Sequence, residues 1–252
     1  MHAYGPAFSR IYNLRWGGFA RQIAPRLLDY YEVTPLAAQN RTILDLCCGA
    51  GHLALYFLEH GYQVIGIDLS ENMLQYARQN ASDYIAAGKA RFIQADAAEF
   101  TLDQQVGMVL STYDALNHLE NFAALRSCFR SVFAVLENGG SFIFDLNTRA
   151  GLKRWNSVSI EDSEDITLIQ RGIYDGISDH AQTRITGYIR TPNGVYERFE
   201  ETVYNTVFEI QSVNQALLEA GWRAVHNARA TEINIPINDP ESEGRVFFVA
   251  RK

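Results

Sequence analysis

The sequence predicts an α/β protein with a Rossmann-like, mostly parallel sheet of seven strands. Apolar strand patterns alternate with helical patterns between residues 42 and 147, as a parallel sheet with crossover helices requires. Beyond residue 150 the helical period disappears and alternating runs, typical of antiparallel strands, take its place. We therefore expect an antiparallel last strand in the main sheet and a small antiparallel β insertion after the fifth strand.

The N-terminal half contains most of the expected helices and parallel strands. Two helices are expected at about 7–15 and 18–32, the second of them broken or begun at Pro25. Parallel strands are expected near 42–48, 63–68, 90–95, 106–112 and 140–146. The helix before the last of these strands has the clearest pattern. Its apolar residues recur at the spacing of one helical face: Leu125, Cys128, Phe129, Val132, Phe133 and Leu136. Gly139 is expected to end that helix.

The C-terminal half is expected to contain the insertion. Tyr- and Thr-rich runs at 165–175, 181–191 and 195–207 are separated by glycine-containing turns, which predicts two or three hairpin strands. A helix at about 209–220 and two strands, 222–231 and 244–251, close the chain. The pattern thus predicts N-terminal helices (1–40) that cover the site, a ligand-binding domain (41–150 and 208–252) and a substrate-covering insertion (151–207).

Composition excludes several classes of function. The 252 residues are 47% hydrophobic and 20% charged, as expected of a soluble globular protein. A net charge of −7 argues against a nucleic-acid partner, which requires basic surface. No apolar run approaches about 18 residues and no polybasic cluster exists, so we expect no membrane partner and a cytoplasmic location. The three cysteines lack the spacing of a metal site or a disulfide framework, so no metal is expected.

A glycine corner follows the first strand. Glycines at 49 and 51 allow a tight turn and let a ligand lie against the main chain beside the positive end of the next helix. The carboxylate of Asp45, four residues before Gly49, can accept hydrogen bonds from an ammonium group. Asp68 ends the second strand, where a carboxylate can hold both hydroxyls of a ribose.

Two ligand families fit this corner. The stretch Gly49-x-Gly51-x-x-Ala54, together with Asp68, satisfies the dinucleotide fingerprint, so a nicotinamide oxidoreductase is one interpretation. However, we find no hydride-handling site. The stretch from Asp45 to Gly51 resembles the first motif, Asp-Leu-x-x-Gly-x-Gly, of the class I S-adenosylmethionine-dependent methyltransferases. Three further stretches resemble that family in order and spacing: Ile67-Asp68-Leu69-Ser70-x-x-Met73-Leu74, Gln94-Ala95-Asp96-Ala97 and Leu136-x-x-Gly139-Gly140-x-Phe142-Ile143-Phe144-Asp145.

The resemblance implies S-adenosylmethionine as cofactor and S-adenosylhomocysteine as product. It places Asp45 and the Gly49 and Gly51 backbone at the amino-acid end of the cofactor, and Asp68 at the ribose. It also places Asp96 at the adenine amine. The implied cofactor-binding residues are Tyr12, Asp45, Cys47, Gly49, Gly51, Asp68, Leu69, Met73, Asp96, Ala97 and Tyr113. Taken singly, a strand-end Asp is often only a helix N-cap.

The segment 111–119, Ser-Thr-Tyr-Asp-Ala-Leu-Asn-His-Leu, would lie beside the transferred methyl group. It resembles a small-molecule subgroup that has an inserted antiparallel sheet and includes N,N-dimethyltransferases acting on amino sugars. The opening Tyr4-x-x-x-Phe8-x-x-Ile11-Tyr12-Asn13 also resembles this subgroup, although Asn13 stands where an Asp is usual. That replacement puts in doubt any role of the acid in binding a substrate amine.

The candidate catalytic residues are His118, Asp114 and Tyr12. An imidazole titrates near neutral pH and could act as a general base, but a loop histidine can equally orient a backbone carbonyl. Tyr12 could shield the sulfonium or simply pack in the core. Arginines of the insertion could face a substrate carboxylate or phosphate, or pair with neighbouring acids such as Glu200 or Glu201.

These observations predict methyl transfer to nitrogen or oxygen of a small-molecule acceptor by direct in-line displacement. A non-catalytic protein that senses S-adenosylmethionine or S-adenosylhomocysteine, or that supports a partner subunit, is the alternative from another functional class. An exposed edge of the inserted sheet could pair with a second copy, which predicts a homodimer.

Overall fold

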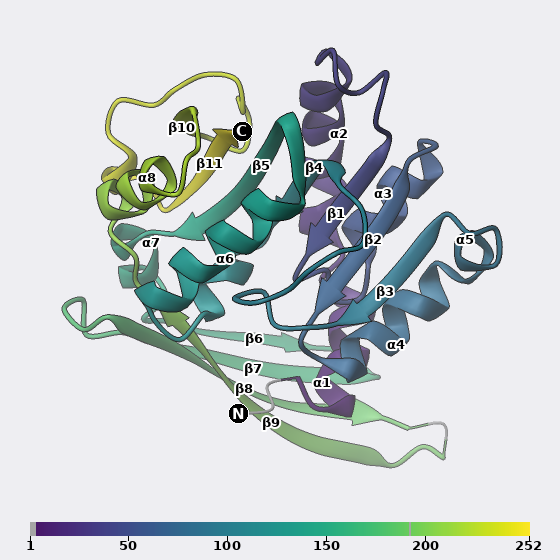
Figure 1. Cartoon of the computed structure of the whole chain (residues 1–252). Coiled ribbons are helices and arrows are strands. Elements are labelled where there is room, and N and C mark those ends of the chain that lie inside the picture. The colour runs from purple at the N-terminus through teal and green to yellow at the C-terminus, as the bar shows by residue number, and fades with distance from the viewer. Residues whose placement is uncertain (1–3, 192) are drawn as a thin grey trace.

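The structure, a computed structural model, describes residues 4–191 and 193–252. Its centre is a seven-stranded sheet of order β10-β11-β5-β4-β1-β2-β3 (Figure 1). The strands are β1 (Thr42–Leu46), β2 (Gln63–Asp68), β3 (Ala90–Gln94), β4 (Val106–Ser111), β5 (Leu136–Asn147), β10 (Ala224–Ala228) and β11 (Arg245–Arg251). The first five strands pair in parallel, and β11 runs antiparallel to both of its neighbours. The Rossmann-like fold class expected from the sequence is confirmed.

Helices cover both faces of this sheet because its strands are apolar on both sides. Ile43 packs into one buried cluster with α2 (Gly18–Glu32), α3 (His52–Glu59) and α4 (Glu71–Asn80), whereas Leu44 packs into another with α6 (Phe122–Val135) and α8 (Ile210–Glu219). The short α5 (Ser82–Ala86) follows α4. Neighbouring residues of a strand point to opposite faces, so one strand serves both cores.

A second sheet lies across the carboxyl ends of the central strands, after α7 (Arg149–Lys153) (Figure 1). Its order is β6 (Val158–Asp162), β7 (Ile166–Ile173), β8 (His180–Arg190), β9 (Tyr196–Thr206), all antiparallel. The insertion therefore has four strands, where the sequence indicated two or three. The strand that the sequence did not predict is β6, at the edge of the sheet. All five of its residues are exposed, so they lack the alternation of buried and exposed side chains that indicates a strand. Helix α1 (Pro6–Arg15) contacts both α4 and β9.

Two local expectations were wrong. Helix α2 continues through Pro25, which lies on its exposed side, while Ile23, Ala24 and Leu27 on the buried side pack against the core. Burial of that face offsets the hydrogen bond that proline cannot donate. Helix α6 ends at Val135, so Gly139 does not stop it.

Instead, Gly139 lies inside β5 with a φ of +84°. The register between β4 and β5 shifts there, and the N–H of Gly139 donates to the carbonyl of Lys252. Gly139 therefore lies in a β-bulge near the start of β5, where its positive φ is allowed. In the part of the chain that the structure describes, every helix is too short or too polar to cross a membrane.

Candidate active site

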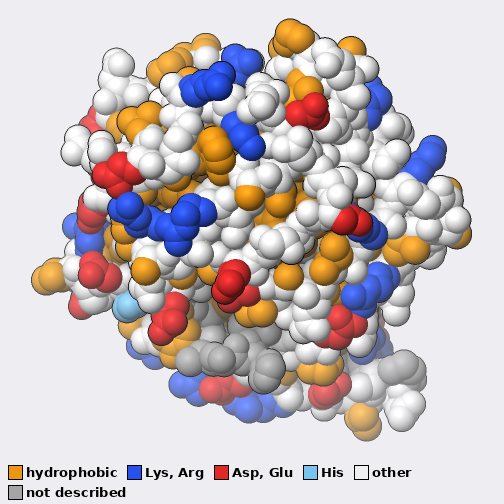
Figure 2. Space-filling view, in the orientation of Figure 1, with side chains coloured by type: hydrophobic (Ala, Val, Ile, Leu, Met, Phe, Trp, Pro, Cys, Tyr) orange, Lys and Arg blue, Asp and Glu red, His pale blue; other side chains and the backbone are white. Residues whose placement is uncertain are grey.

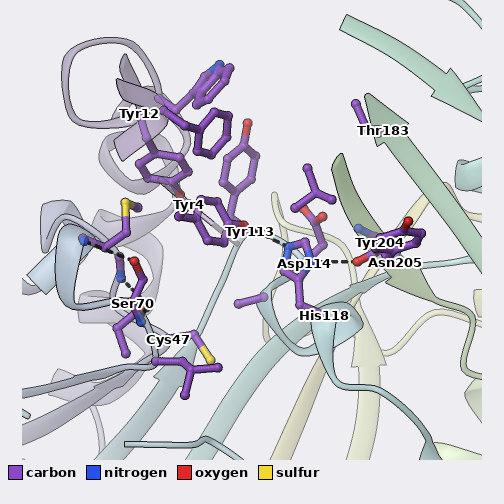
Figure 3. A pocket seen from close by; sticks show the side chains of 18 of the residues that line it. Tyr4, Tyr12, Cys47, Ser70, Tyr113, Asp114, His118, Thr183, Tyr204 and Asn205 are labelled. Carbon is purple, nitrogen blue, oxygen red and sulfur yellow. Dashed lines mark hydrogen bonds between the residues drawn. The ribbon is translucent and has the colours of Figure 1, made fainter. Parts of the chain in front are cut away.

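A cavity of about 760 Å³ lies between the carboxyl ends of the central strands and the inserted sheet. Its size is typical of small-ligand sites. Its walls come from α1, the turn after β1, the ends of β2, β3 and β4, and strands β7 to β9 (Figure 3). Segments from both ends of the sequence therefore meet around one space.

The glycine corner forms one end of this cavity. Gly49 and Gly51 have φ values of +54° and +76°, in the left-handed region that favours glycine. The N–H of Gly49 donates to Oδ2 of Asp68 at 2.8 Å, and the N–H of Ser70 donates to Oδ1 at 2.9 Å. Burial raises the pKa of the Asp68 carboxyl, while these two N–H groups oppose the shift. The Asp68 carboxylate is thus held in a fixed orientation at the cavity wall.

Most residues expected at the site line this single cavity. They are Tyr12, Cys47, Gly49, Asp68, Leu69, Met73, Asp96, Ala97, Tyr113, Asp114 and His118. Asp45 and Gly51 do not line it. Asp45 is buried beneath the turn, where its Oδ2 accepts a hydrogen bond from the N–H of Ala54 at 3.0 Å. Burial raises the pKa of Asp45 to about 8. A direct contact between Asp45 and a ligand stays a prediction. What the structure shows is the hydrogen bond that joins Asp45 to Ala54, in the first turn of α3.

Tyr12 lies over the glycine turn. A Cβ placed on Gly49 would lie 3.6 Å from the Tyr12 ring, and that ring contacts Trp16 edge-on at a centroid distance of 5.5 Å. Tyr12 is therefore both an aromatic packing residue and part of the cavity wall.

Asn13 does not line the cavity. Its Oδ1 accepts a hydrogen bond from Nδ2 of Asn80 on α4 at 2.8 Å. The residue that replaces the usual Asp thus anchors α1 to α4.

His118 lies at the other end of the cavity, in the short helix η1 (Ala115–His118). Its Nδ1 is 2.8 Å from the carbonyl oxygen of Tyr204 on β9. A carbonyl can only accept, so in the neutral ring Nδ1 carries the hydrogen and Nε2 is left as an acceptor. Nε2 lies 3.4 Å from the hydroxyl of Tyr4, and burial raises the pKa of that phenol, which keeps it protonated.

Tyr4 separates the two ends of the cavity. Figure 3 shows it between Tyr12 and Cys47 on one side and Asp114 and His118 on the other. Its carbonyl accepts a hydrogen bond from Asn72 on α4, and the following N–H, of Gly5, donates to Glu201 on β9 at 2.6 Å. The opening motif contained Tyr4, but its position between the two ends arises from contacts with distant segments.

Backbone strain is concentrated at this cavity. Within residues 4–191 and 193–252, four non-glycine residues have a positive φ: Tyr4 (71°), Cys47 (60°), Tyr113 (70°) and Asp114 (52°). All four line the cavity. Such conformations are sparsely populated and tend to be retained where function requires them. The sequence carried no signal of this strain, since none of the four is a glycine.

Three arginines of the inserted sheet, Arg184, Arg190 and Arg198, pair with acids, and none of the three lines the cavity. Arg184 and Arg198 both bind Glu200, at 2.8 and 2.7 Å, and Arg190 binds Glu164 at 2.7 Å. Basic and acidic side chains lie intermixed along the lower edge of the molecule, where this sheet lies (Figure 2). The cavity instead meets uncharged side chains of the sheet, including Gln170, Gly172, Thr183, Ile185, Thr202 and Val203.

Two arginines outside the strands of the inserted sheet line the cavity, Arg154 and Arg245, and sequence analysis recognised neither as a site residue. Arg245 lies at the start of β11. It lines the cavity, and its guanidinium pairs with the carboxylates of Asp114, at 2.7 Å, and Asp145. These partners lie about a hundred residues away in the chain, so local pattern gives no sign of the contact.

Comparisons with known proteins agree with this architecture. Residues 43–140 match the family model described as "Methyltransferase domain". The chain is 30% identical over 214 residues to the Bacillus subtilis protein YqeM, whose name assigns it to the methyltransferases; the match covers 83% of each chain. It is 24% identical over 219 residues to a Streptomyces venezuelae dTDP-3-amino-3,4,6-trideoxy-alpha-D-glucopyranose N,N-dimethyltransferase, covering 84% of this chain and 89% of that one. Among solved structures, an S-adenosylmethionine-dependent methyltransferase from Clostridium acetobutylicum superimposes with a TM-score of 0.77 over 97% of both chains, at 18% identity.

Proposed function

This chain belongs to the S-adenosylmethionine-dependent methyltransferases, and from that premise we propose that it methylates nitrogen or oxygen of a small-molecule acceptor by direct in-line displacement. The observation that carries the proposal is the single cavity. The glycine corner and Asp68 form one end of it, and His118, Asp114 and the inserted sheet form the other. A donor and an acceptor bound at these two ends would meet near Tyr4.

The glycine corner fits the cofactor. A Cβ on Gly49 would lie 3.1 Å from Met73 and 3.6 Å from Tyr12, so only glycine leaves the main chain open to a ligand here. We assign the ribose to Asp68, the adenine end to Leu69, Met73, Asp96 and Ala97, and the amino-acid end to the turn at Cys47 and Gly49. When bound, S-adenosylmethionine supplies a methyl group on a sulfonium, which is already an activated donor.

The acceptor end favours an amine. Arg245 is shared by Asp114 and Asp145, so one guanidinium faces two carboxylates, and Arg154 also lines the cavity. The Asp114 carboxylate lies in the cavity wall, where it can attract an acceptor that arrives as an ammonium ion. The Tyr204 carbonyl holds Nδ1 of His118, so Nε2, which lies 3.4 Å from the Tyr4 hydroxyl, would have to exchange this contact for the amine to take the proton that the amine must lose before attack.

Positioning supplies most of the catalysis in this mechanism. Holding the nucleophile in line with the methyl group is worth up to about 7–11 kcal/mol. A general base adds on the order of 10²–10⁴-fold. Tyr12 and Tyr113 would help by excluding water from the transfer region, since both rings line the cavity.

The first test is calorimetric titration with S-adenosylhomocysteine. We expect micromolar binding that weakens by about 10- to 100-fold in Asp68→Asn, because the amide cannot replace the carboxylate at two ribose hydroxyls. Asp83→Asn, an exposed acid on α5, is the matched control and should bind like the wild type. Absence of binding in the wild type would remove the basis of the proposal.

The second test is a screen of small amines and alcohols for consumption of the methyl donor. For an amine that is methylated, we expect His118→Ala to lower kcat by at least tenfold, with His60→Ala, remote from the cavity, unchanged. A loss of less than about threefold would exclude His118 as general base. Tight S-adenosylhomocysteine binding without turnover of any tested acceptor would favour the alternative, a non-catalytic cofactor sensor or partner subunit.

A further inference from the structure

Tyr113 and Asp114 form a strained pair beside the expected position of the methyl group. They are consecutive non-glycine residues with φ values of +70° and +52°. Each such residue costs about 1–3 kcal/mol unless its surroundings impose the conformation. The surroundings of this pair must therefore contain a group that holds it.

That group is the carboxylate of Asp145, at the end of β5. Its Oδ1 accepts the N–H of Tyr113 at 2.7 Å, and its Oδ2 accepts the N–H of Asp114 at 2.9 Å. Successive N–H groups of this kind form a nest that binds an anion. Here the anion is the carboxylate of Asp145, and the Asp145 side chain is fully buried. Burial raises the pKa of the Asp145 carboxyl, whereas Arg245 beside it lowers the pKa.

Arg245 completes the arrangement from β11. One arm of its guanidinium binds Asp145, and Nη2 binds Oδ1 of Asp114 at 2.7 Å. The guanidinium also lies over the rings of Phe19 and Tyr113, which stack at 4.9 Å. An uncompensated carboxylate at this depth would be strongly destabilising, so Arg245 allows Asp145 to remain an anion.

We propose that Asp145, with Arg245 as its counter-ion, is a positioning residue for the acceptor. It acts by holding the strained Tyr113–Asp114 turn so that the Asp114 carboxylate faces the cavity. The inference rests on the proposed function, because it assumes that the acceptor binds at Asp114. Asp145 itself does not line the cavity, so it works only through the turn.

A double-mutant cycle separates this role from a general stabilising ion pair. We expect Asp145→Asn and Asp114→Asn each to lower kcat/KM for an amine found in the screen by at least tenfold. The double variant should be no more than about threefold worse than Asp114→Asn, because both changes remove the same Asp114 contact. Binding of S-adenosylhomocysteine should stay within about threefold in all three variants, and Asp83→Asn should behave like the wild type. A loss in the double variant equal to the product of the single losses would overturn the proposal.

A measurement without an acceptor keeps the inference testable if the screen finds none. In the amide ¹H–¹⁵N spectrum, the N–H protons of Tyr113 and Asp114 should resonate far downfield, since both donate to a carboxylate. We expect Asp145→Asn to move both upfield and Asp114→Asn to leave them nearly unchanged. Unchanged shifts in Asp145→Asn would overturn the positioning role, independently of whether the protein methylates an amine.

Discussion

At the scale of single residues, the two buried acids near the glycine corner, Asp68 and Asp45, differ in the number of backbone N–H groups that donate to them. Asp68 accepts two backbone N–H groups and faces the cavity, whereas Asp45 accepts one and lies beneath the turn. A carboxylate with so few donors at this depth favours its neutral form. Asp45 therefore supports the turn and the first residues of α3, and its protonation links the stability of the corner to pH.

Asp45 should make the protein less stable as pH rises. Its folded-state pKa is about 8, against an ordinary value of 3.8, so between these values only the folded state holds the proton. The contribution is fully present below about pH 4 and is lost progressively up to pH 8. We expect Asp45→Asn, which keeps the acceptor for Ala54, to gain in Tm relative to the wild type between pH 5 and pH 9. Thermal unfolding by circular dichroism checks this. A difference in Tm that does not change with pH would contradict it.

At the scale of elements, the N-terminal segment 4–15, which contains α1, is attached at three points. Asn80 binds Asn13 near the end of α1, Asn72 binds the carbonyl of Tyr4 before the start of the helix, and Glu201 binds the N–H of Gly5. Two of these partners belong to α4 and one to β9, so both the central domain and the inserted sheet hold the segment over the cavity.

Loosening one attachment should speed the exchange of cofactor. We expect Glu201→Ala to raise the dissociation rate of S-adenosylhomocysteine by about 2- to 10-fold, the effect of losing one half-buried hydrogen bond to a charged group. Stopped-flow displacement measures this rate. Glu197→Ala, at an exposed position of the same strand, is the control. Equal rates in the two variants would show that the Glu201 contact does not restrain the segment.

At the scale of the whole molecule, the inserted sheet ends in an open edge. Among the residues that the structure describes, β6 pairs with β7 alone, and Val158 and Ile160 are 58% and 68% exposed. An edge with free N–H and C=O groups and apolar side chains is suited to pairing with another strand. We therefore propose that two copies pair through this sheet.

Sedimentation tests the proposed dimer. We expect the wild type to sediment as a dimer at micromolar concentration and Ile160→Lys to shift it to monomer, because the charge would be buried in the interface. Ile177→Lys, an 82% exposed residue in the turn between β7 and β8, controls for the added charge. A monomeric wild type at tens of micromolar would refute the pairing.

Prediction from the sequence succeeded where the signal was local. The glycine corner and the position of Asp68 depend on a few consecutive residues and on the end of an apolar strand. It failed at Pro25, at Gly139 and at strand β6. At Pro25 and Gly139, packing or pairing with a distant segment outweighed the local preference, as tertiary context commonly does. Strand β6 was missed because all five of its residues are exposed, so its sequence has no buried alternation.

The sequence by itself determined the alternation of helices and strands between residues 42 and 147, the glycine corner with its acid at Asp68, and through them the methyltransferase family. These features are local, since hydrophobic periodicity and turn preferences depend on residues that are neighbours in the sequence. Only the tertiary structure decided that Tyr4, His118 and Tyr204 meet, and that Arg245 joins Asp114 to Asp145. Such contacts join segments about a hundred residues apart, so they depend on strand register and on how the two sheets pack.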